Sequence, residues 1–433
     1  MGCGSMKLFG SMNIRNNNLC IGEINTLDLA KKFGTPLYVM DETLIRDNCR
    51  RYITSFNIGK NKVAYAGKAF LTKAMCNLVK EEGLFLDVVS GGEIFTAYKS
   101  GFPMEKIYFH GNNKTMEEIE MAIDLGIGTF VVDNFQELDI INTACKNKSM
   151  KQRVILRIIP GIEAHTHEYI KTGQIDSKFG FTLIDNGAIK AVKKAYELEN
   201  LQFVGIHCHI GSQIFETKPY EEEIEIMLKL IKRINEDLNI EIEELDLGGG
   251  FGIYYKEGDK PKEIEEFCKI ILNKVESYSK EIGIRKPILV IEPGRSIVGN
   301  SGVTLYSVGS IKEIPNVAKY VAVNGGMTDN IRPALYKSEY ECVVCNKVLD
   351  DLVEKVKIVG KCCESGDVLI NNAKLPIVET NDLLAILNTG AYGYSMASNY
   401  NKALLPSVVF VNNDKTKLVC RRQSYENLIQ NEV

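Results

Sequence analysis

The fold of this 433-residue chain is constrained most by eight short apolar runs rich in β-forming residues. Stretches with helical periodicity separate these runs. Each run is too short for a buried helix, whereas residues 116–125 and 220–238 carry apolar residues at three- and four-residue spacing. Strands that alternate with helices pair in parallel through right-handed crossovers, so eight such units predict an α/β protein with a (β/α)8 barrel. An open, doubly wound sheet is the alternative. The eight runs cover residues 62–66, 84–89, 107–110, 129–133, 154–158, 203–209, 244–248 and 288–292.

The pattern changes after about residue 300, where strand-like runs follow one another with few helices between them. This predicts a second, mainly β domain of sandwich or barrel type. A helix is expected at residues 26–33, with Thr26 as its N-terminal cap and Gly34 at its end. We therefore expect three parts: an N-terminal segment that joins the β domain, the barrel, and the C-terminal β domain, over residues 1–38, 39–308 and 309–433. The strand-like runs of the second domain cover residues 303–314, 319–324, 340–348, 355–359, 383–387 and 407–411.

The composition excludes several classes of protein. A net charge of −4 gives no reason to expect binding to nucleic acid or to an anionic membrane. No apolar run approaches the roughly 20 residues that span a bilayer. Twelve cysteines at irregular spacing indicate reduced thiols in the cytoplasm rather than a disulfide framework. Cys342 and Cys345 form a CxxC pair inside a strand-like run, so we expect ordinary strand residues and no bound metal.

Polar residues gather where the predicted strands end, which is where the active site of an α/β barrel lies. All five histidines of the chain fall in or just after one of these strands, at positions 110, 165, 167, 207 and 209. The other polar residues at strand ends are Lys68, Asp87, Asn112, Arg157, Glu292 and Arg295, together with the glycine run 248–250.

Three of these features suggest a chemistry. An amine at a barrel mouth, such as that of Lys68, can be desolvated, which lowers its pKa and lets it attack an aldehyde. The glycines at 248–250 let the backbone approach a phosphate, although a tight turn would also explain them. Glu292 can keep a pyridine nitrogen protonated, and Arg295 offers a planar fork for a phosphate or carboxylate, although a local ion pair is the simpler interpretation.

His207 and His209 alternate along a strand with one residue between them, so both imidazoles are expected to point the same way. Such a pair could bind a metal ion, stack on a flat cofactor or form hydrogen bonds within the core. The residues alone leave these three interpretations open.

Taken together, the motifs resemble the fold-type III pyridoxal-phosphate decarboxylase family, from about Gly34 to Leu405. They occur in the family's order along nearly the whole chain. Small departures are Phe70, where the family usually has Asn, and Lys361-Cys362, where Gly-Pro is common. The motifs are Tyr65-Ala66-Gly67-Lys68-Ala69, His165-Thr166-His167-Glu168-Tyr169-Ile170, Asp176-Ser177-Lys178-Phe179-Gly180, His207-Cys208-His209-Ile210-Gly211-Ser212-Gln213, Gly248-Gly249-Gly250-Phe251-Gly252, Glu292-Pro293-Gly294-Arg295, Arg332-Pro333-Ala334-Leu335-Tyr336, Cys363-Glu364-Ser365-Gly366-Asp367 and Gly390-Ala391-Tyr392-Gly393-Tyr394.

The resemblance implies pyridoxal 5′-phosphate as cofactor and assigns roles to these residues. Lys68 would carry the cofactor as a Schiff base, His209 would stack on its ring, and Glu292 would pair with the pyridine nitrogen. The remaining cofactor-binding residues expected are Asp87, Ser212, Gly248, Gly249, Gly250, Gly294, Arg295 and Tyr392.

The resemblance also implies a homodimer with active sites at the interface, where Cys363 and Glu364 are donated in trans. Cys363 would return the proton to the carbon that loses CO₂. The residues expected to bind the substrate are Arg157, Arg295, Arg332, Tyr336, Glu364 and Tyr392.

The activity that the resemblance implies is decarboxylation of meso-2,6-diaminopimelate to L-lysine, the last step of lysine biosynthesis. Another decarboxylase of the family, acting on arginine, ornithine or carboxynorspermidine, is the first alternative. A metal-dependent barrel hydrolase using the two His-x-His pairs is a second, but it leaves Lys68 and the glycine run without a purpose. A non-enzymatic homologue is a third, although Lys68, Glu292 and Cys363 are all retained.

Overall fold

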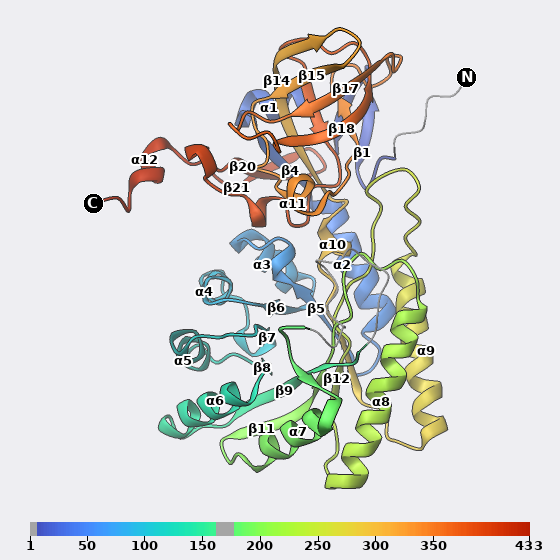
Figure 1. Cartoon of the computed structure of the whole chain (residues 1–433), viewed down its shortest axis with the longest axis vertical. Helices are drawn as coiled ribbons and strands as arrows, with labels where there is room; N and C mark the ends of the chain where they lie inside the picture. The colour runs from blue at the N-terminus through green and yellow to red at the C-terminus, as the bar shows by residue number, and fades with distance from the viewer. Residues whose placement is uncertain (1–6, 162–176) are drawn as a thin grey trace. The chain divides into compact units, whose positions relative to one another are not determined.

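The computed structural model describes residues 7–161 and 177–433 and divides into two compact units (Figure 1). The barrel unit comprises Asn48–Gly252 and Pro261–Gly294, and the β unit comprises the described part of Met1–Asp47 with Ile253–Lys260 and Arg295–Val433. Strand β14 (Gly302–Ile314) continues through residue 308 as one element. The domain limits expected at residues 38 and 308 remain a prediction.

Eight parallel strands form a closed barrel, which confirms the predicted architecture and excludes the open sheet. Their order is β9-β11-β12-β13-β5-β6-β7-β8, and pairing of β8 with β9 closes the ring, while the short β10 (Phe181–Thr182) extends from β9. All eight predicted runs contain a strand. The barrel strands are β5 (Lys62–Ala66), β6 (Phe85–Val88), β7 (Ile107–Phe109), β8 (Thr129–Val132), β9 (Gln152–Ile159), β11 (Leu201–His207), β12 (Glu244–Asp246) and β13 (Ile288–Ile291).

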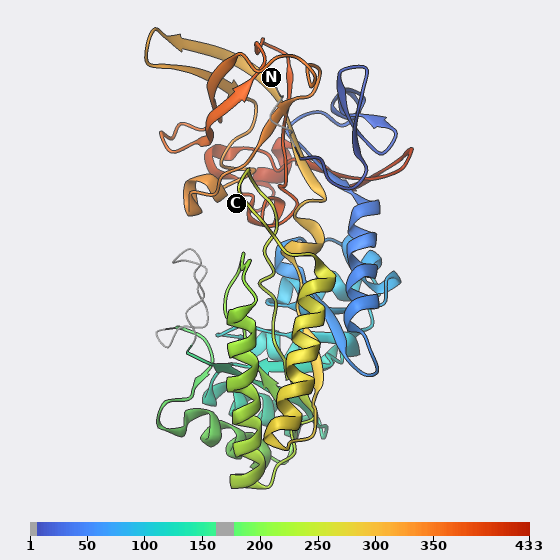
Figure 2. The same ribbon diagram turned by 90° about the vertical axis from the view of Figure 1, so that its right-hand side faces the viewer.

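Helices separate the barrel strands, and side-chain caps explain where several of them begin. Thr115 and Glu118 form a reciprocal capping box at α5, and Asn134 caps α6 through the amide of Glu137. The two long helices α8 and α9 lie side by side (Figure 2). The helices are α2 (Glu42–Phe56), which crosses the limit between the units, α3 (Lys73–Glu81), α4 (Gly91–Lys99), α5 (Met116–Asp124), α6 (Phe135–Asn147), α7 (Gly187–Glu197), α8 (Lys218–Leu238) and α9 (Ile264–Ile282).

The inside of the barrel is a packed core and not a channel. Side chains from six different strands meet there in one buried cluster, and the partly buried Phe85 packs against it. The buried members are Ala64, Tyr108, Val131, Ile155, Val204 and Val290. Because small and β-branched residues and the ring of Tyr108 fill this space, polar groups are left to the strand ends.

The β unit is built around a second sheet, as expected for a mainly β domain. Its strands follow the order β18-β17-β15-β14-β4-β20-β21, with β19 paired to β14 and β16. The run expected at 340–348 is a strand only over three residues, and β18 and β21 were not expected, because polar residues interrupt their apolar pattern. The strands are β4 (Leu37–Asp41), β14 (Gly302–Ile314), β15 (Ala318–Val323), β16 (Cys342–Val344), β17 (Glu354–Val359), β18 (Val368–Leu375), β19 (Leu383–Ile386), β20 (Ser407–Asn412) and β21 (Lys415–Cys420).

The N-terminal segment belongs to the β unit through strand β4, which pairs with β14 and β20. Before it come the antiparallel strands β1 (Met12–Arg15), β2 (Asn18–Ile21) and β3 (Ile24–Asn25), and helix α1 (Thr26–Phe33). The cap expected at Thr26 is wrong: the side chain of Asn25 accepts from the amide of Leu27, and the Thr26 hydroxyl donates to the carbonyl of Leu19. Gly34 ends the helix with φ +72°, as predicted.

Three short helices complete the β unit: α10 (Arg295–Val298), α11 (Arg332–Tyr336) and α12 (Tyr425–Ile429). Residues 342 and 345 are both free cysteines, the first in β16 and the second directly after it. Among the helices of the described residues, none combines the length and the apolar character needed to cross a membrane.

Candidate active site

A buried polar cluster lies at the C-terminal ends of the barrel strands. The Nε2 atom of His110, just after β7, lies 2.7 Å from Oε1 of Glu292, just after β13. The same nitrogen lies 3.6 Å from Oδ1 of Asp87 in β6, and Nε2 of His207, at the end of β11, lies 3.4 Å from the other Glu292 oxygen. All four side chains are at most 6% exposed. The structure thus brings Asp87 and Glu292 together, as expected, and adds both imidazoles.

Burial and neighbouring groups shift the pKa values of Glu292 and Asp87 in opposite directions. Although burial alone would raise it, the adjacent imidazoles of His110 and His207 hold the pKa of Glu292 well below its usual range. Burial raises the pKa of Asp87, an effect that the charge on Lys68 opposes. Glu292 is therefore the carboxyl in this cluster that stays ionised most readily.

Lys68 lies in the short helical turn Gly67–Ala69 that follows β5. Its charge acts on both Asp87 and His209. Burial and then the Lys68 charge lower the pKa of His209 well below its ordinary value, so His209 is neutral at pH 7. Lys68 and His209 therefore belong to the same end of the barrel.

The glycine run after β12 packs against the two neighbouring loops. The amide of Gly249 donates to Nδ1 of His209 at 3.3 Å, and the amide of Ile214 donates to the carbonyl of Gly250 at 2.9 Å. Gly250 has φ +100°, and a Cβ there would lie 2.3 Å from the carbonyl oxygen of Gly211. Only glycine permits this approach of backbone to backbone. Ser212, half-buried, sits in the same loop as Ile214.

The loop after β13 also lies very close to its neighbours. A Cβ on Gly249 would lie 2.2 Å from the carbonyl oxygen of Glu292, and one on Gly294 would lie 2.9 Å from the Cβ of Ala66. The glycines thus set the spacing between the strand-end loops that carry His209, Glu292 and Lys68.

The structure separates the two imidazoles of the His-x-His pair, which were expected to point the same way. His207 faces Glu292, whereas His209 contacts Gly249. The only described group of residues able to hold a metal ion consists of His110, His207, Asp246 and Glu292, and His209 is not in it. The second pair, His165 and His167, lies outside the described residues.

Arg157 is buried in the barrel unit, 8% exposed, with its guanidinium 4.2 Å above the ring of Phe179. The carboxylate of Asp133, after β8, accepts from the amide of Gly180 at 2.9 Å and so holds the same segment. Binding of substrate by Arg157 remains a prediction.

The β unit contains a separate cluster of arginines and tyrosines. Arg295 donates from Nη1 to the hydroxyl of Tyr255 at 2.6 Å, and its guanidinium carbon lies 4.8 Å from the ring centre of Tyr392. The guanidinium carbon of Arg332 lies 5.5 Å from the same ring. Two buried cations therefore share Tyr392, an arrangement suited to anionic groups.

Arg332 forms hydrogen bonds to hydroxyls and not to carboxylates within the described part of the chain. Its Nε donates to the Tyr340 hydroxyl at 2.9 Å and its Nη2 to that of Ser338 at 3.4 Å. The Tyr336 ring lies 5.2 Å from the guanidinium. A buried guanidinium with neutral partners keeps its charge available to an anionic ligand.

Cys363 and Glu364 are exposed on the loop between β17 and β18. The buried carboxylate of Asp367 holds this loop by accepting from the amides of Met327 at 2.6 Å and Cys362 at 2.9 Å. Gly360 would place a Cβ 2.1 Å from the same carboxylate. The backbone that presents Cys363 and Glu364 is thus fixed.

Sequence reasoning missed roles for Asp246 and Asp367. Asp246 lies between two leucines, so it is hidden in a strand pattern, although its place two residues before the glycine run could have indicated a site residue. Asp367 ends the Cys363-Glu364-Ser365-Gly366-Asp367 motif, and its partner Met327 is forty residues away.

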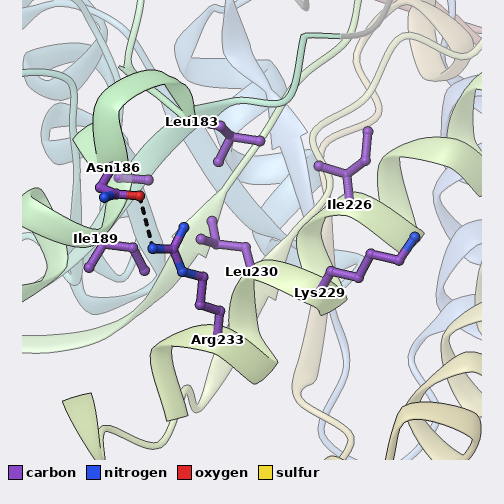
Figure 3. Close-up of a pocket in the computed structure, with 8 residues that line it drawn as sticks. Leu183, Asn186, Ile189, Ile226, Lys229, Leu230 and Arg233 are labelled. Atoms are coloured by element: carbon purple, nitrogen blue, oxygen red, sulfur yellow. Dashed lines mark hydrogen bonds between the residues drawn. The ribbon is translucent and has the colours of Figure 1, made fainter. Parts of the chain in front are cut away.

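A shallow pocket elsewhere in the barrel unit lies between α7 and α8 (Figure 3). Leu183, Ile189 and Leu230 contribute apolar lining, and Nη2 of Arg233 donates to Oδ1 of Asn186 at 2.8 Å. None of the expected site residues lines this pocket, so it is not part of the strand-end cluster.

The comparisons with known proteins identify the family. The family model described as the pyridoxal binding domain of pyridoxal-dependent decarboxylases matches residues 42–299, and the chain belongs to this family. Within it, the chain is 52% identical over 408 residues to the diaminopimelate decarboxylase of Bacillus methanolicus, covering 94% of each chain. It is 49% identical over 418 residues to the diaminopimelate decarboxylase of Bacillus subtilis, with 96% of this chain and 95% of the relative covered.

Solved structures give the same result. A diaminopimelate decarboxylase from M. jannaschii, also solved in complex with L-lysine, has a TM-score of 0.92 and 39% identity over 98% of both chains. The Helicobacter pylori diaminopimelate decarboxylase complexed with L-lysine has a TM-score of 0.86 and 32% identity, with 94% of this chain and 98% of the other covered.

Proposed function

We propose that this chain is a pyridoxal-5′-phosphate-dependent decarboxylase that converts meso-2,6-diaminopimelate to L-lysine and CO₂, the last step of lysine biosynthesis. The observation that carries the proposal is the combination of a buried, ionised Glu292 with Lys68, His209 and the glycine run at one end of a barrel. Relatives of this name match nearly the whole chain.

The residues at the barrel mouth fit pyridoxal phosphate. Lys68 would hold it through its amine, Glu292 would pair with the pyridine nitrogen, and the neutral imidazole of His209 would face the ring. Gly248–Gly250 provide a backbone without side chains for the phosphate. Asp87, Ser212, Gly294, Arg295 and Tyr392 are assigned to cofactor binding by the resemblance. When bound, the cofactor supplies a protonated ring that accepts the electrons left by departing CO₂.

Arg332 supports a substrate with a distant carboxylate. The far end of meso-diaminopimelate carries one ammonium and one carboxylate, so it needs one partner of each sign. The buried guanidinium of Arg332, held by hydroxyls, would bind the carboxylate, and Glu364 would bind the ammonium. An enzyme that forms a diamine meets only an ammonium there and has no use for this arginine.

We also propose that the protein is a homodimer in which Cys363 and Glu364 of the partner subunit complete each site. Both side chains are exposed on a loop that Asp367 holds in place, which suits residues offered to another chain. Cys363 would donate the proton of its Sγ to the carbon that has lost CO₂. The eleven described cysteines are all free, which supports the reducing environment of the cytoplasm, and cell fractionation would test this location.

The activity is tested by incubating the purified protein with pyridoxal phosphate and meso-diaminopimelate and measuring lysine and CO₂. Ornithine and arginine are assayed in parallel. Formation of lysine from meso-diaminopimelate alone supports the proposal, whereas preferred turnover of ornithine or arginine would replace it with the corresponding decarboxylase.

Mixing two inactive variants tests the shared site. If Cys363 acts in trans, Lys68→Ala and Cys363→Ala proteins should regain activity together after subunit exchange, because the heterodimer contains one intact site. Absence of recovery in a mixture shown to contain heterodimers would place Cys363 in the same subunit as its Lys68.

A further inference from the structure

Four buried side chains meet at the C-terminal end of the barrel: His110, His207, Asp246 and Glu292. His207 and Asp246 end β11 and β12, and His110 and Glu292 directly follow β7 and β13; one nitrogen or oxygen atom of each lies within 4.8 Å of those of the others. None is more than 6% exposed. Two carboxyls buried this close together cannot both be ionised at low cost, so they must share a proton.

The neighbours of each carboxyl decide where the negative charge lies. Glu292 has an imidazole nitrogen near each of its oxygens, His110 at 2.7 Å and His207 at 3.4 Å. Asp246 has one conventional donor, the amide of Gly248, at 2.9 Å from Oδ1. Within the described residues, Oδ2 of Asp246, Oε1 of Glu292 and Nε2 of both imidazoles are buried without a hydrogen bond of standard geometry, and the four groups lie within 4.8 Å of one another.

We propose that Asp246 is a neutral acid that donates a hydrogen bond to Glu292, and that His110 and His207 are positioning residues that donate to the same carboxylate. The three donors confine the single negative charge of the cluster to Glu292. This inference rests on the proposed function, because Glu292 is the group assigned to the pyridine nitrogen.

The proton affinities of the groups agree with this geometry. Burial and the adjacent Glu292 charge raise the pKa of Asp246 well above its usual range, whereas the two imidazoles hold that of Glu292 well below. Burial lowers the pKa of His207 to about 3, so its ring is neutral and donates through one nitrogen only. The other charged groups that act on this cluster are Asp87, Lys68, Arg157 and, on Asp246 itself, Glu244.

The same four residues could instead hold a divalent metal ion, since imidazole and carboxylate are common ligands of zinc. The two possibilities make opposite demands on Asp246. A metal ligand must be ionised, whereas a donor to Glu292 must carry a proton.

Asparagine at position 246 distinguishes the neutral acid from the metal ligand, because its side chain has the shape and the donor of a protonated aspartic acid but carries no charge. In Asp246→Asn, the side-chain oxygen can still accept from the amide of Gly248 and the side-chain nitrogen can still donate to Glu292. Asp246→Leu has a similar volume and provides neither. Glu292→Gln removes the charge that the cluster is proposed to hold.

Two readouts, neither of which is turnover, compare the variants. One is the dissociation constant of pyridoxal phosphate from the apoprotein by fluorescence quenching, and the other is the ¹⁵N chemical shift of cofactor labelled at the pyridine nitrogen. Asp246→Asn should keep the shift of the protonated ring and change the dissociation constant by no more than about threefold. Asp246→Leu and Glu292→Gln should move the shift toward neutral pyridine and weaken binding by about tenfold or more.

A large loss in Asp246→Asn, equal to that in Glu292→Gln, would overturn the inference, as would zinc binding by the wild-type apoprotein that Asp246→Asn abolishes. If Asp246→Leu fails to fold by circular dichroism, the isosteric Asn variant still decides. An unaltered ¹⁵N shift in Glu292→Gln would contradict instead the proposed role of Glu292.

The imidazole at position 110 is tested by a matched pair. His110→Gln keeps a donor near the position of Nε2, and His110→Met fills similar space without one. Under the proposal, the Met variant loses ring protonation and the Gln variant retains it. Equal shifts in both would show that His110 has only a packing role.

Discussion

Replacing Arg332 with methionine should raise the KM for meso-diaminopimelate strongly and change kcat less. The guanidinium has five N–H donors, of which one binds Tyr340 well and one reaches Ser338 only at 3.4 Å, so a fork remains for a carboxylate. Hydrogen bonds to a charged group contribute about 1.5–3 kcal/mol, which corresponds to about a 10- to 100-fold increase in KM. Methionine keeps the apolar stem that packs near Tyr336 and Tyr392.

The assay is steady-state production of lysine over a wide range of meso-diaminopimelate concentrations. The dissociation constant of pyridoxal phosphate and the melting temperature serve as controls, because neither should change greatly. Arg332→Lys keeps the charge without the planar fork and should give an intermediate KM. A KM within twofold of wild type in the Met variant, with the cofactor bound normally, would remove Arg332 from the substrate site.

Three further predictions concern the backbone and the buried charges. Gly250→Ala should weaken pyridoxal phosphate binding by about tenfold or more because its Cβ would clash with backbone. Gly258→Ala is the matched control: Gly258 has φ +99°, close to the +100° of Gly250, but its Cβ would meet nothing within 4 Å, so binding should not change. Equal dissociation constants for the two variants would exclude the clash. Burial raises the pKa of Glu223 to about 8, so this carboxyl costs stability as pH rises from its unfolded value of about 4.5 to about 8. Glu223→Gln should accordingly leave the free energy of unfolding unchanged near about pH 4 and raise it by up to about 4 kcal/mol at about pH 9. The same difference from wild type at both pH values, measured by urea unfolding, would refute this. Lys62→Met should cost about 3 kcal/mol of unfolding free energy because Glu244, 0% exposed, loses the nearer of its two cations and keeps only Arg153 at 3.9 Å. Adding Glu244→Gln should recover most of this loss in urea unfolding, and no recovery would contradict the ion pair.

The barrel was predictable because its strands carry a strong local signal. Residues 63–66 are apolar, Ile288–Ile291 is apolar and mostly β-branched, and both runs are bounded by turn residues, so their assignment needs no knowledge of neighbouring strands. The predicted end of β12 at Gly248 was too late, since this glycine has φ +62° and turns the chain away. Strand β4 was not anticipated, because a strand that lies before the barrel in sequence pairs with two strands far along the chain.

The identities of the candidate site residues were predicted better than the contacts between them. Lys68, His209 and Glu292 stand out as polar groups after apolar strands. No local pattern shows, however, whether His207 or His209 faces a carboxylate. That choice follows from where β11 ends, because His207 is its last residue and His209 lies beyond it, and from the close approach of Gly249 to Glu292. The proton on Asp246 likewise depends on distances between strands.

The most direct test of the account is the covalent site of the cofactor. The protein, loaded with pyridoxal phosphate and reduced with borohydride, should carry the cofactor on the proteolytic peptide that contains Lys68, as read by mass spectrometry. Lys68→Ala protein treated in the same way should carry none. A reduced cofactor attached to another lysine, or its absence from wild-type protein that still forms lysine, would contradict the central claim.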